Sequence, residues 1–286
     1  MILVPISDDN DEGHSHHHHD FVHYGIISIC IALTIYEGWI YGHGGTEAIR
    51  AFIEQWSFEP RRLGDNFLRA SFLDRAVLLA KYLSHLENMG LVKMLASTFL
   101  HAGLAHLFGN ILILWMLGDN VEYAMGHLRY LLFFLLAGIV SNFGDVVFTS
   151  VATFRGGIGA SGAVMAVAGA YMFYFPKARI NFFYLFMVFW WGIFSLPARV
   201  VIGIYFLLQL AVAYADYGSN YDMVAMWAHV TGFVIGFLLA WPLRKNRKEA
   251  LWQPHARKAY NKTLMAAMRE RRELTGGDHW GNDPRK

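Results

Sequence analysis

Residues 130–148 read YLLFFLLAGIVSNFGDVVF, an apolar run of nineteen residues. A helix needs about 20 mostly apolar residues to cross a bilayer, so this run predicts a membrane-spanning helix. The composition agrees, because 55% of the 286 residues are hydrophobic and only 16% are charged. A soluble domain carries about 25% charged residues. The chain is therefore expected to be a membrane protein, and the same figures exclude disordered, collagen-like and coiled-coil proteins.

Five other runs have a similar length and composition. We expect further spans near residues 21–41, 94–117, 161–175, 198–215 and 223–243. The predicted fold class is all-α: a polytopic membrane protein with a bundle of six transmembrane helices. Residues 180–196, between the fourth and fifth spans, are rich in aromatic side chains and bracketed by prolines. We favour a segment at the headgroup boundary there over a short additional span.

Basic residues are concentrated near the C-terminus. Residues 244–286 hold twelve Lys or Arg against five acids, and six spans would place sixteen basic residues on one side and eight on the other. Because Lys and Arg favour the inner side, both termini are predicted to be cytoplasmic. We expect three parts: a flexible acidic and His-rich head (1–20), a membrane domain (21–243) and a basic tail (244–286).

The connection between the first two spans, residues 43–93, is too long for a simple turn. Its apolar and charged residues alternate at helix-like spacing. We expect short helices on the outer membrane surface, interrupted at Pro60. The N-terminus lacks the basic region and the small-residue cleavage site of a secretory signal, so the first apolar run is expected to remain as a span.

Polar residues within the predicted spans are informative because they are costly in lipid. In the second span, His106 and Asn110 are four residues apart and share one helix face. His101 precedes His106 by five residues and therefore faces a different neighbour. These side chains can tie helices together or donate hydrogen bonds to a buried site. The five-residue spacing, with no carboxylate nearby, argues against a metal site.

The fourth span begins with a glycine-rich segment, Gly156-Gly157-Ile158-Gly159-Ala160-Ser161-Gly162-Ala163. A serine at a helix N-terminus is placed where the helix dipole favours developing negative charge. The alternative is a serine that only caps the helix, followed by a packing face of small residues (Gly162, Ala166 and Ala170).

The sixth span contains Ala228-His229-Val230-Thr231-Gly232-Phe233-Val234-Ile235-Gly236. Gly232 and Gly236 form a strip that can press against a second small-faced helix, which the fourth span supplies. We infer that His229, at the edge of this strip, then reaches Ser161. The alternative is a buried, hydrogen-bonded histidine with a structural role.

Metal and cofactor chemistry is not expected. The single cysteine, Cys30, excludes internal disulfides and a thiolate-only metal site. Residues 14–19 read HSHHHH and can bind a transition metal weakly, although a flexible tract before the first span is the preferred interpretation. No cofactor is predicted.

These motifs together resemble the rhomboid family of intramembrane serine proteases. The resemblance covers about residues 21–243 and rests on His101-x4-His106-x3-Asn110, Gly159-Ala160-Ser161-Gly162 and Ala228-His229-x2-Gly232-x3-Gly236. Residues 117–122 and 126–130 are also similar, and residues 175–179 and 196–198 look like the bacterial branch. The resemblance therefore implies a bacterial cytoplasmic membrane as the location.

The resemblance implies a role for each matching residue. Ser161 is expected to be the nucleophile and His229 the general base of a dyad without a third acid. The side chains of His106 and Asn110, with the backbone amide of Ser161, are expected to form the oxyanion hole. Supporting positions are His101, Gly159, Gly162, Met165, Gly232 and Gly236. Met165 departs from several relatives, which carry an aromatic ring there, and an aromatic-Arg pair before the second span is replaced by Val92-Lys93.

The expected activity is that of an intramembrane serine endopeptidase. A serine hydroxyl needs a neighbouring base to become a nucleophile, and a tetrahedral intermediate needs hydrogen-bond donors. The expected partners are the lipid bilayer and single-span or other transmembrane protein substrates, without nucleic acid. One alternative is a catalytically silent rhomboid-like protein that binds or escorts membrane clients. A small transporter is another, although it would need more ionisable residues along a path.

Overall fold

A computed structural model describes residues 2–8, 21–57, 70–84, 90–148, 158–186, 190–215 and 225–245. The chain divides into a compact unit, Met1–Leu243, and a second unit, Arg244–Lys286, of which only the first two residues are described. Several predictions concern positions outside the described residues: the His-rich tract, Pro60, Gly156, Gly157 and most of the basic tail.

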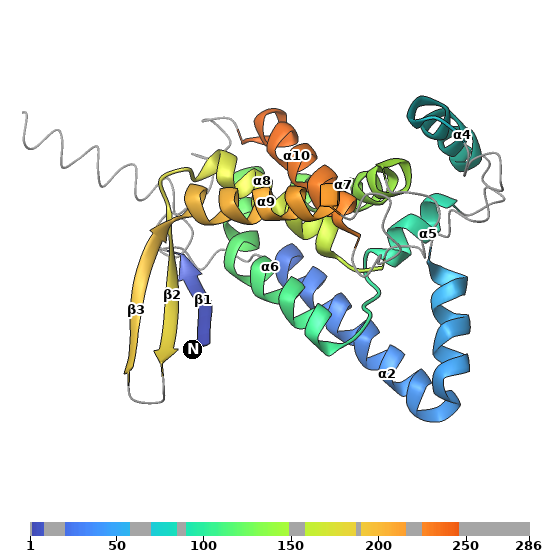
Figure 1. The fold of residues 1–286 in the computed structure, drawn as a ribbon, viewed down its shortest axis with the longest axis horizontal. Helices are drawn as coiled ribbons and strands as arrows, with labels where there is room; N and C mark the ends of the chain where they lie inside the picture. Colours follow the sequence, from blue (N-terminus) through green and yellow to red (C-terminus); the bar gives the residue numbers. More distant parts are fainter. Residues whose placement is uncertain are drawn as a thin grey trace, which may run out of the picture. The chain divides into compact units, whose positions relative to one another are not determined.

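The first unit is mainly helical (Figure 1). Five helices are long and apolar enough to cross a membrane: α2 (Phe21–Trp56), α6 (Leu104–Met125), α7 (His127–Phe148), α9 (Ala198–Ala215) and α10 (Met226–Leu243). The prediction of a polytopic helical membrane protein is confirmed. A sixth apolar helix, α8 (Ser161–Tyr174), has only 14 residues. The count of six spans therefore stays a prediction.

The connection after the first span differs in detail from the prediction. Helix α2 continues well beyond the expected end near residue 41 and turns sharply at Gly45, whose φ of 68° suits glycine (Figure 1). Two short helices follow, α4 (Phe72–Ser84) and α5 (Gly90–Ser97), as the helix-like spacing predicts. Their place on the outer membrane surface stays a prediction.

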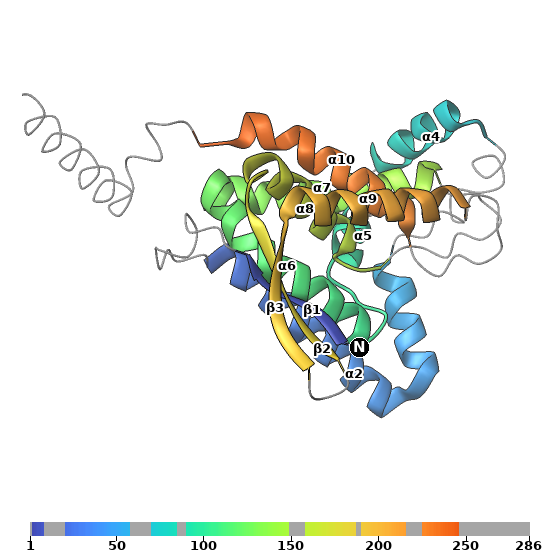
Figure 2. The same cartoon turned by 60° about the vertical axis from the view of Figure 1, so that its left-hand side comes forward.

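Residues 180–186 and 190–196 form strands, so they are not an additional helical span, and their place at the headgroup boundary stays a prediction. Strand β2 (Arg179–Phe186) pairs antiparallel with β3 (Trp190–Pro197) and with β1 (Ile2–Asp8), so the three strands lie side by side in the order β1-β2-β3 (Figure 1). Figure 2 shows the same sheet from another side. Aromatic and β-branched residues favour a pleated strand, which explains why this aromatic run adopts one. The predicted all-α fold therefore also contains one small three-stranded sheet.

The N-terminal strand corrects the expectation of a flexible head for residues 2–8. Asp8 is 4% exposed. Its carboxylate accepts hydrogen bonds from Asn120 Nδ2 at 2.9 Å and from the hydroxyl of Tyr171. Strand pairing with β2 and this buried contact hold the segment in place, because a carboxylate is buried only with partners. Pairing between residues so distant in sequence leaves no local signal.

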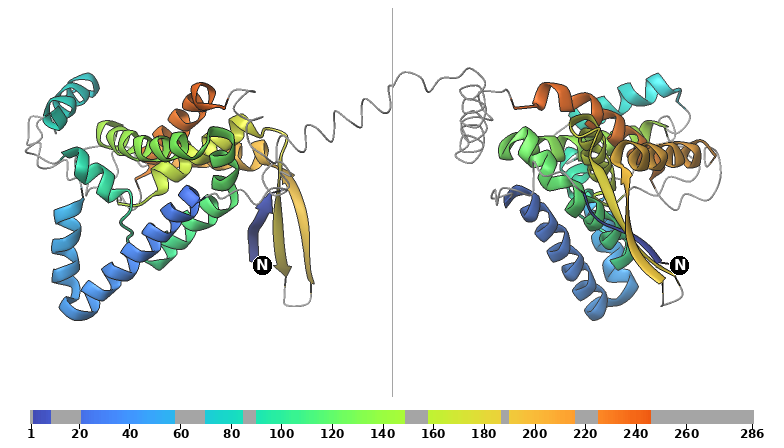
Figure 3. Two further views of the ribbon diagram at one scale, coloured as in Figure 1. Left: turned by 180° about the vertical axis from the view of Figure 1, so that it is seen from behind. Right: turned by 90° about the vertical axis from the view of Figure 1, so that its left-hand side faces the viewer.

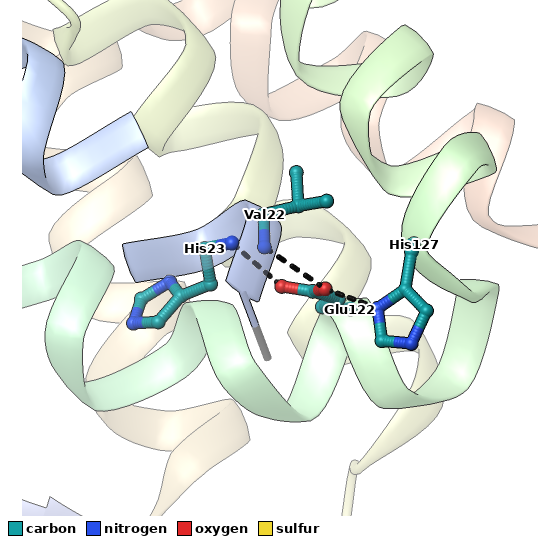
Figure 4. A network of polar contacts seen from close by, with 4 residues as sticks. All are labelled: Val22, His23, Glu122 and His127. Atoms are coloured by element: carbon teal, nitrogen blue, oxygen red, sulfur yellow. Dashed lines mark hydrogen bonds and ion pairs between the residues drawn. The ribbon is translucent and has the colours of Figure 1, made fainter. Parts of the chain in front are cut away.

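The N-terminal end of α2 is fixed by a buried carboxylate on α6. Glu122 accepts the backbone N–H of His23 at 2.7 Å and that of Val22 at 3.4 Å, and it also pairs with His127 Nδ1 at 2.5 Å (Figure 4). These are first-turn N–H groups, which have no partner within their own helix. The contact anchors α2 where it runs alongside α6 (Figure 3).

Helix α8 lies at the centre of the helical unit and packs against α6, α7, α9 and α10. Every residue from Gly162 to Tyr171 is buried. Its closest neighbour is α10: a Cβ atom on Gly232 would lie 2.1 Å from Gly162 O, and one on Gly236 would lie 2.0 Å from Ala166 O. The predicted contact between the two small-residue faces is confirmed. It brings the helix that carries His229 against the helix that begins at Ser161.

Candidate active site

The turn before α8 requires a glycine at residue 159. Gly159 has a φ of 130°, and a Cβ atom there would lie 2.5 Å from His106 Cε1. Its backbone N–H donates to Ser97 O at 2.8 Å. The helix is capped by Ala160 without a side-chain hydrogen bond, and Ser161 is its first residue. Ser161 is therefore not the capping residue of α8, and its hydroxyl is not used for that purpose.

A cavity of about 200 Å³ lies where α6, α8, α9 and α10 meet. All four residues for which the sequence predicts a chemical role line it: His106, Asn110, Ser161 and His229. Met165, a predicted supporting residue, and Tyr205, which was not predicted, line it as well. These side chains come from positions more than a hundred residues apart in the chain. The fold therefore collects the predicted residues around one space.

Two nitrogens at this cavity are buried without a hydrogen-bond partner among the described residues: His229 Nε2 and Asn110 Nδ2. Both side chains are 6% exposed. Buried polar atoms are nearly always paired, so an unpaired one indicates strain, an unseen water or a functional role. The other ring nitrogen of His229, Nδ1, lies 3.2 Å from Gln209 Oε1 on α9. Ser161 is half-buried.

His101 lies outside the cavity, in the turn before α6. Its backbone N–H donates to Glu37 Oε1 at 3.2 Å, and its ring meets the His106 ring edge-on at 5.4 Å. Burial, together with the smaller repulsion from His106, lowers the pKa of His101 to about 4. The ring is therefore neutral at physiological pH. His101 supports the wall formed by His106 and does not line the reaction space.

The predicted supporting glycines act through close packing. A Cβ atom on Gly162 would lie 2.2 Å from Ser141 Oγ on α7, and Gly232 and Gly236 make the contacts with α8 given above. None of the three lines the cavity. Met165 does line it, and is 1% exposed.

Three residues near the site were not singled out from the sequence: Gln209, Glu37 and Asp145. Gln209 contacts His229, Glu37 holds the backbone of His101, and Asp145 Oδ1 accepts the backbone N–H of Ala228 at 3.2 Å. Each is a polar or charged residue within an apolar helix, which is the signal that marks a functional or structural position in a membrane. In the parts of the chain that are described, no group of three His, Cys, Asp or Glu could hold a metal.

The fold is that of a polytopic helical membrane protein with polar side chains around a cavity between its helices. Residues 88–246 match the family model described as Rhomboid domain, which is more than half of the chain. The chain belongs to the rhomboid family.

Three relatives show the range of the similarity. The human protein named presenilin-associated rhomboid-like protein, mitochondrial, is 38% identical over 94 residues, which are 32% of this chain and 24% of that protein. Rhomboid protease GluP of Bacillus subtilis (strain 168) is 38% identical over 81 residues, 28% of this chain and 15% of its own length. Putative rhomboid protease YdcA of the same organism is 29% identical over 150 residues, 52% of this chain and 65% of its own. This chain therefore covers about a quarter of the length of each of these mitochondrial relatives.

Proposed function

We propose that this chain is an intramembrane serine endopeptidase with a dyad of Ser161 and His229. The observation that carries the proposal is that both residues line one cavity together with His106 and Asn110, in a protein of the rhomboid family. The printed names of two bacterial relatives, rhomboid protease and putative rhomboid protease, support the same activity.

The proposed reaction begins with proton transfer. His229 Nε2 takes the proton of the Ser161 hydroxyl, and Oγ attacks the carbonyl carbon of the scissile peptide bond. The carbonyl oxygen becomes an oxyanion, which accepts hydrogen bonds from the side chains of His106 and Asn110 and from the backbone amide of Ser161. The protonated His229 then gives its proton to the leaving nitrogen as the C–N bond breaks.

An acyl group now joins the substrate to Ser161 Oγ, and water completes the reaction. His229 takes a proton from that water, whose oxygen attacks the acyl carbon, and the proton returns to Ser161 Oγ when the acid product leaves. The unpaired Asn110 Nδ2 supports this assignment, because a donor without an internal partner is available to a developing oxyanion. No cofactor takes part.

The proposed substrate is a transmembrane helix with small or helix-weak residues near its outer end. A stable helix keeps its carbonyls in internal hydrogen bonds, so the peptide bond becomes accessible only where the helix unwinds. The bilayer and a single-span or other membrane protein are therefore the proposed partners, without nucleic acid.

For the membrane arrangement, we propose six spans, with α8 as the short one, and both termini on the inner side of a bacterial cytoplasmic membrane. The support is the excess of basic residues on that side. A single cysteine can test it in a Cys30→Ser background. An impermeant maleimide added to spheroplasts should label Glu47→Cys, whose side chain is 84% exposed, and should spare Lys286→Cys. The reverse pattern would overturn the arrangement.

The activity is tested with protein in liposomes that also contain a single-span substrate with a Gly- and Ala-rich outer end. Ser161→Ala should abolish cleavage and leave thermal unfolding unchanged. Ser28→Ala, which removes an exposed hydroxyl on α2, serves as the matched control and should keep full activity. Cleavage by Ser161→Ala would remove Ser161 as the nucleophile. Substrate binding without any cleavage by the wild-type protein would favour the client-binding alternative.

A further inference from the structure

Gln209 is a polar side chain on a helix that otherwise contributes apolar and aromatic groups near the cavity. It is half-buried on α9, one turn after the cavity-lining Tyr205. Its Oε1 lies 3.2 Å from Nδ1 of His229 on α10. In the described part of the chain, this is the one hydrogen bond that the ring of His229 makes.

The contact has a chemical consequence for the imidazole. A neutral imidazole carries a hydrogen on one ring nitrogen and a lone pair on the other. An amide oxygen can only accept, so the contact selects the tautomer with its hydrogen on Nδ1. The lone pair then belongs to Nε2, the nitrogen that is buried without a partner in a residue that lines the same cavity as Ser161.

We propose that Gln209 is a positioning residue that holds His229 in the tautomer and ring orientation needed to accept the proton of Ser161. The proposal rests on the function proposed above. In a Ser-His-Asp triad, a buried carboxylate on the far ring nitrogen performs this task. Here a neutral amide performs it, which avoids the cost of placing an ionised carboxylate within a membrane helix.

A purely structural role would be to tie α9 to α10, as interhelical hydrogen bonds often do. The two helices already have an apolar contact close by: the rings of Phe206 and Phe233 stack with centroids 4.2 Å apart and an interplanar angle of 20°. Removal of the amide therefore leaves the helices packed and changes what touches the imidazole.

The first test measures how fast a fluorophosphonate probe labels Ser161 in the full-length protein in detergent. Gln209→Met has a similar volume and lacks the amide oxygen, so we expect labelling about tenfold slower, the effect of one hydrogen bond. Gln209→Glu keeps an acceptor at the same place and should label within about threefold of the wild-type rate. Leu208→Met, at an adjacent position that is 59% exposed, is the matched control and should match the wild type.

The second test measures the tautomer directly. The ¹⁵N signals of His229 are identified as those that Ala substitution removes from histidine-labelled protein. The wild type and Gln209→Glu should show a protonated Nδ1 and an unprotonated Nε2, whereas Gln209→Met should show a mixture of both neutral tautomers. A residue that only ties helices together would lower the unfolding temperature and leave this signature unchanged.

The outcomes separate this inference from the proposed function. No labelling of the wild-type protein, or labelling that survives Ser161→Ala, overturns the dyad and the inference with it. Labelling that depends on Ser161 and His229 but proceeds equally fast in Gln209→Met overturns the inference alone. An unchanged tautomer in Gln209→Met does the same.

Discussion

Helix α10 is flanked by two helices that contact it in different ways. On one side, glycines of α10 lie against backbone carbonyls of α8, with no room for a Cβ atom. On the other side, α9 meets α10 through side chains, namely the Phe206–Phe233 stack and the Gln209–His229 contact. Helix α9 is also the more peripheral of these two flanking helices, because only 17% of its most apolar stretch is buried, whereas every residue of α8 from Gly162 to Tyr171 is buried.

The candidate site needs both a short distance between Ser161 and His229 and a defined orientation of the His229 ring, and these depend on different contacts of α10. Ser161 and His229 belong to α8 and α10, so their relative position depends on a contact between backbones, which cannot adjust without separating the helices. The orientation of the His229 ring depends on the side-chain contact with α9. The distance between Ser161 and His229 is thus controlled by α8, and the orientation of the His229 ring is controlled by α9.

The largest effect is expected from breaking the backbone contact. In Gly236→Ala, the new methyl group would lie 2.0 Å from Ala166 O, which is backbone and cannot rotate away. We expect a loss of about 3 kcal/mol in the free energy of unfolding, at the upper end of overpacking effects. Chemical unfolding in detergent measures this loss.

The matched control is Gly203→Ala on α9, where a Cβ atom would have nothing within 4 Å. Alanine stabilises a helix interior by up to about 1 kcal/mol relative to glycine, so this variant should be as stable as the wild type or slightly more so. Equal stability of the two alanine variants would contradict the distinction between the two sides of α10.

The contact between the backbones of α8 and α10 could be predicted because the pattern that indicates it lies within each helix. Small residues at four-residue steps in the fourth and sixth spans predict two faces that can approach closely, and the structure places Gly232 against Gly162 and Gly236 against Ala166. The four-residue spacing of His106 and Asn110 likewise predicts a shared face, and both side chains line the cavity. Helical periodicity within one segment was sufficient in these cases.

The sequence was uninformative where the contact joins distant segments. A run of aromatic residues fits an interfacial segment, a short span or a strand, and the hairpin at residues 179–197 depends on pairing that extends to residues 2–8. Gln209 was overlooked for the same reason. A single glutamine in an apolar helix carries no mark of the ring it contacts, which belongs to another helix twenty residues later.

An intermediate effect, on rate instead of stability, is expected on the α6 side of the cavity. Asn110 Nδ2 is buried without a partner in the described structure, so Asn110→Ala should leave the free energy of unfolding nearly unchanged. If its amide serves the oxyanion, cleavage and probe labelling should fall about 100-fold.

Asn142 on α7 is the matched control for this prediction, since its Nδ2 donates to Met94 O at 2.9 Å and to Ser97 Oγ at 3.2 Å. Asn142→Ala should therefore lower the free energy of unfolding by about 1–2 kcal/mol and leave the rate of the folded protein unchanged. An Asn110→Ala variant that loses stability but keeps its rate would assign Asn110 a structural role.

The smallest effect is expected from weakening the side-chain contact of α9. Phe206→Leu keeps an apolar side chain and removes the aromatic stack on Phe233, which is worth about 1 kcal/mol beyond its buried area. The free energy of unfolding should fall by that amount, while Gln209 keeps its contact and probe labelling stays within about twofold of the wild type. Leu207→Ala, at a side chain that is 61% exposed, controls for a general loosening of α9. Labelling as slow as that of Gln209→Met would show that the packing of α9, and not the amide, orients His229.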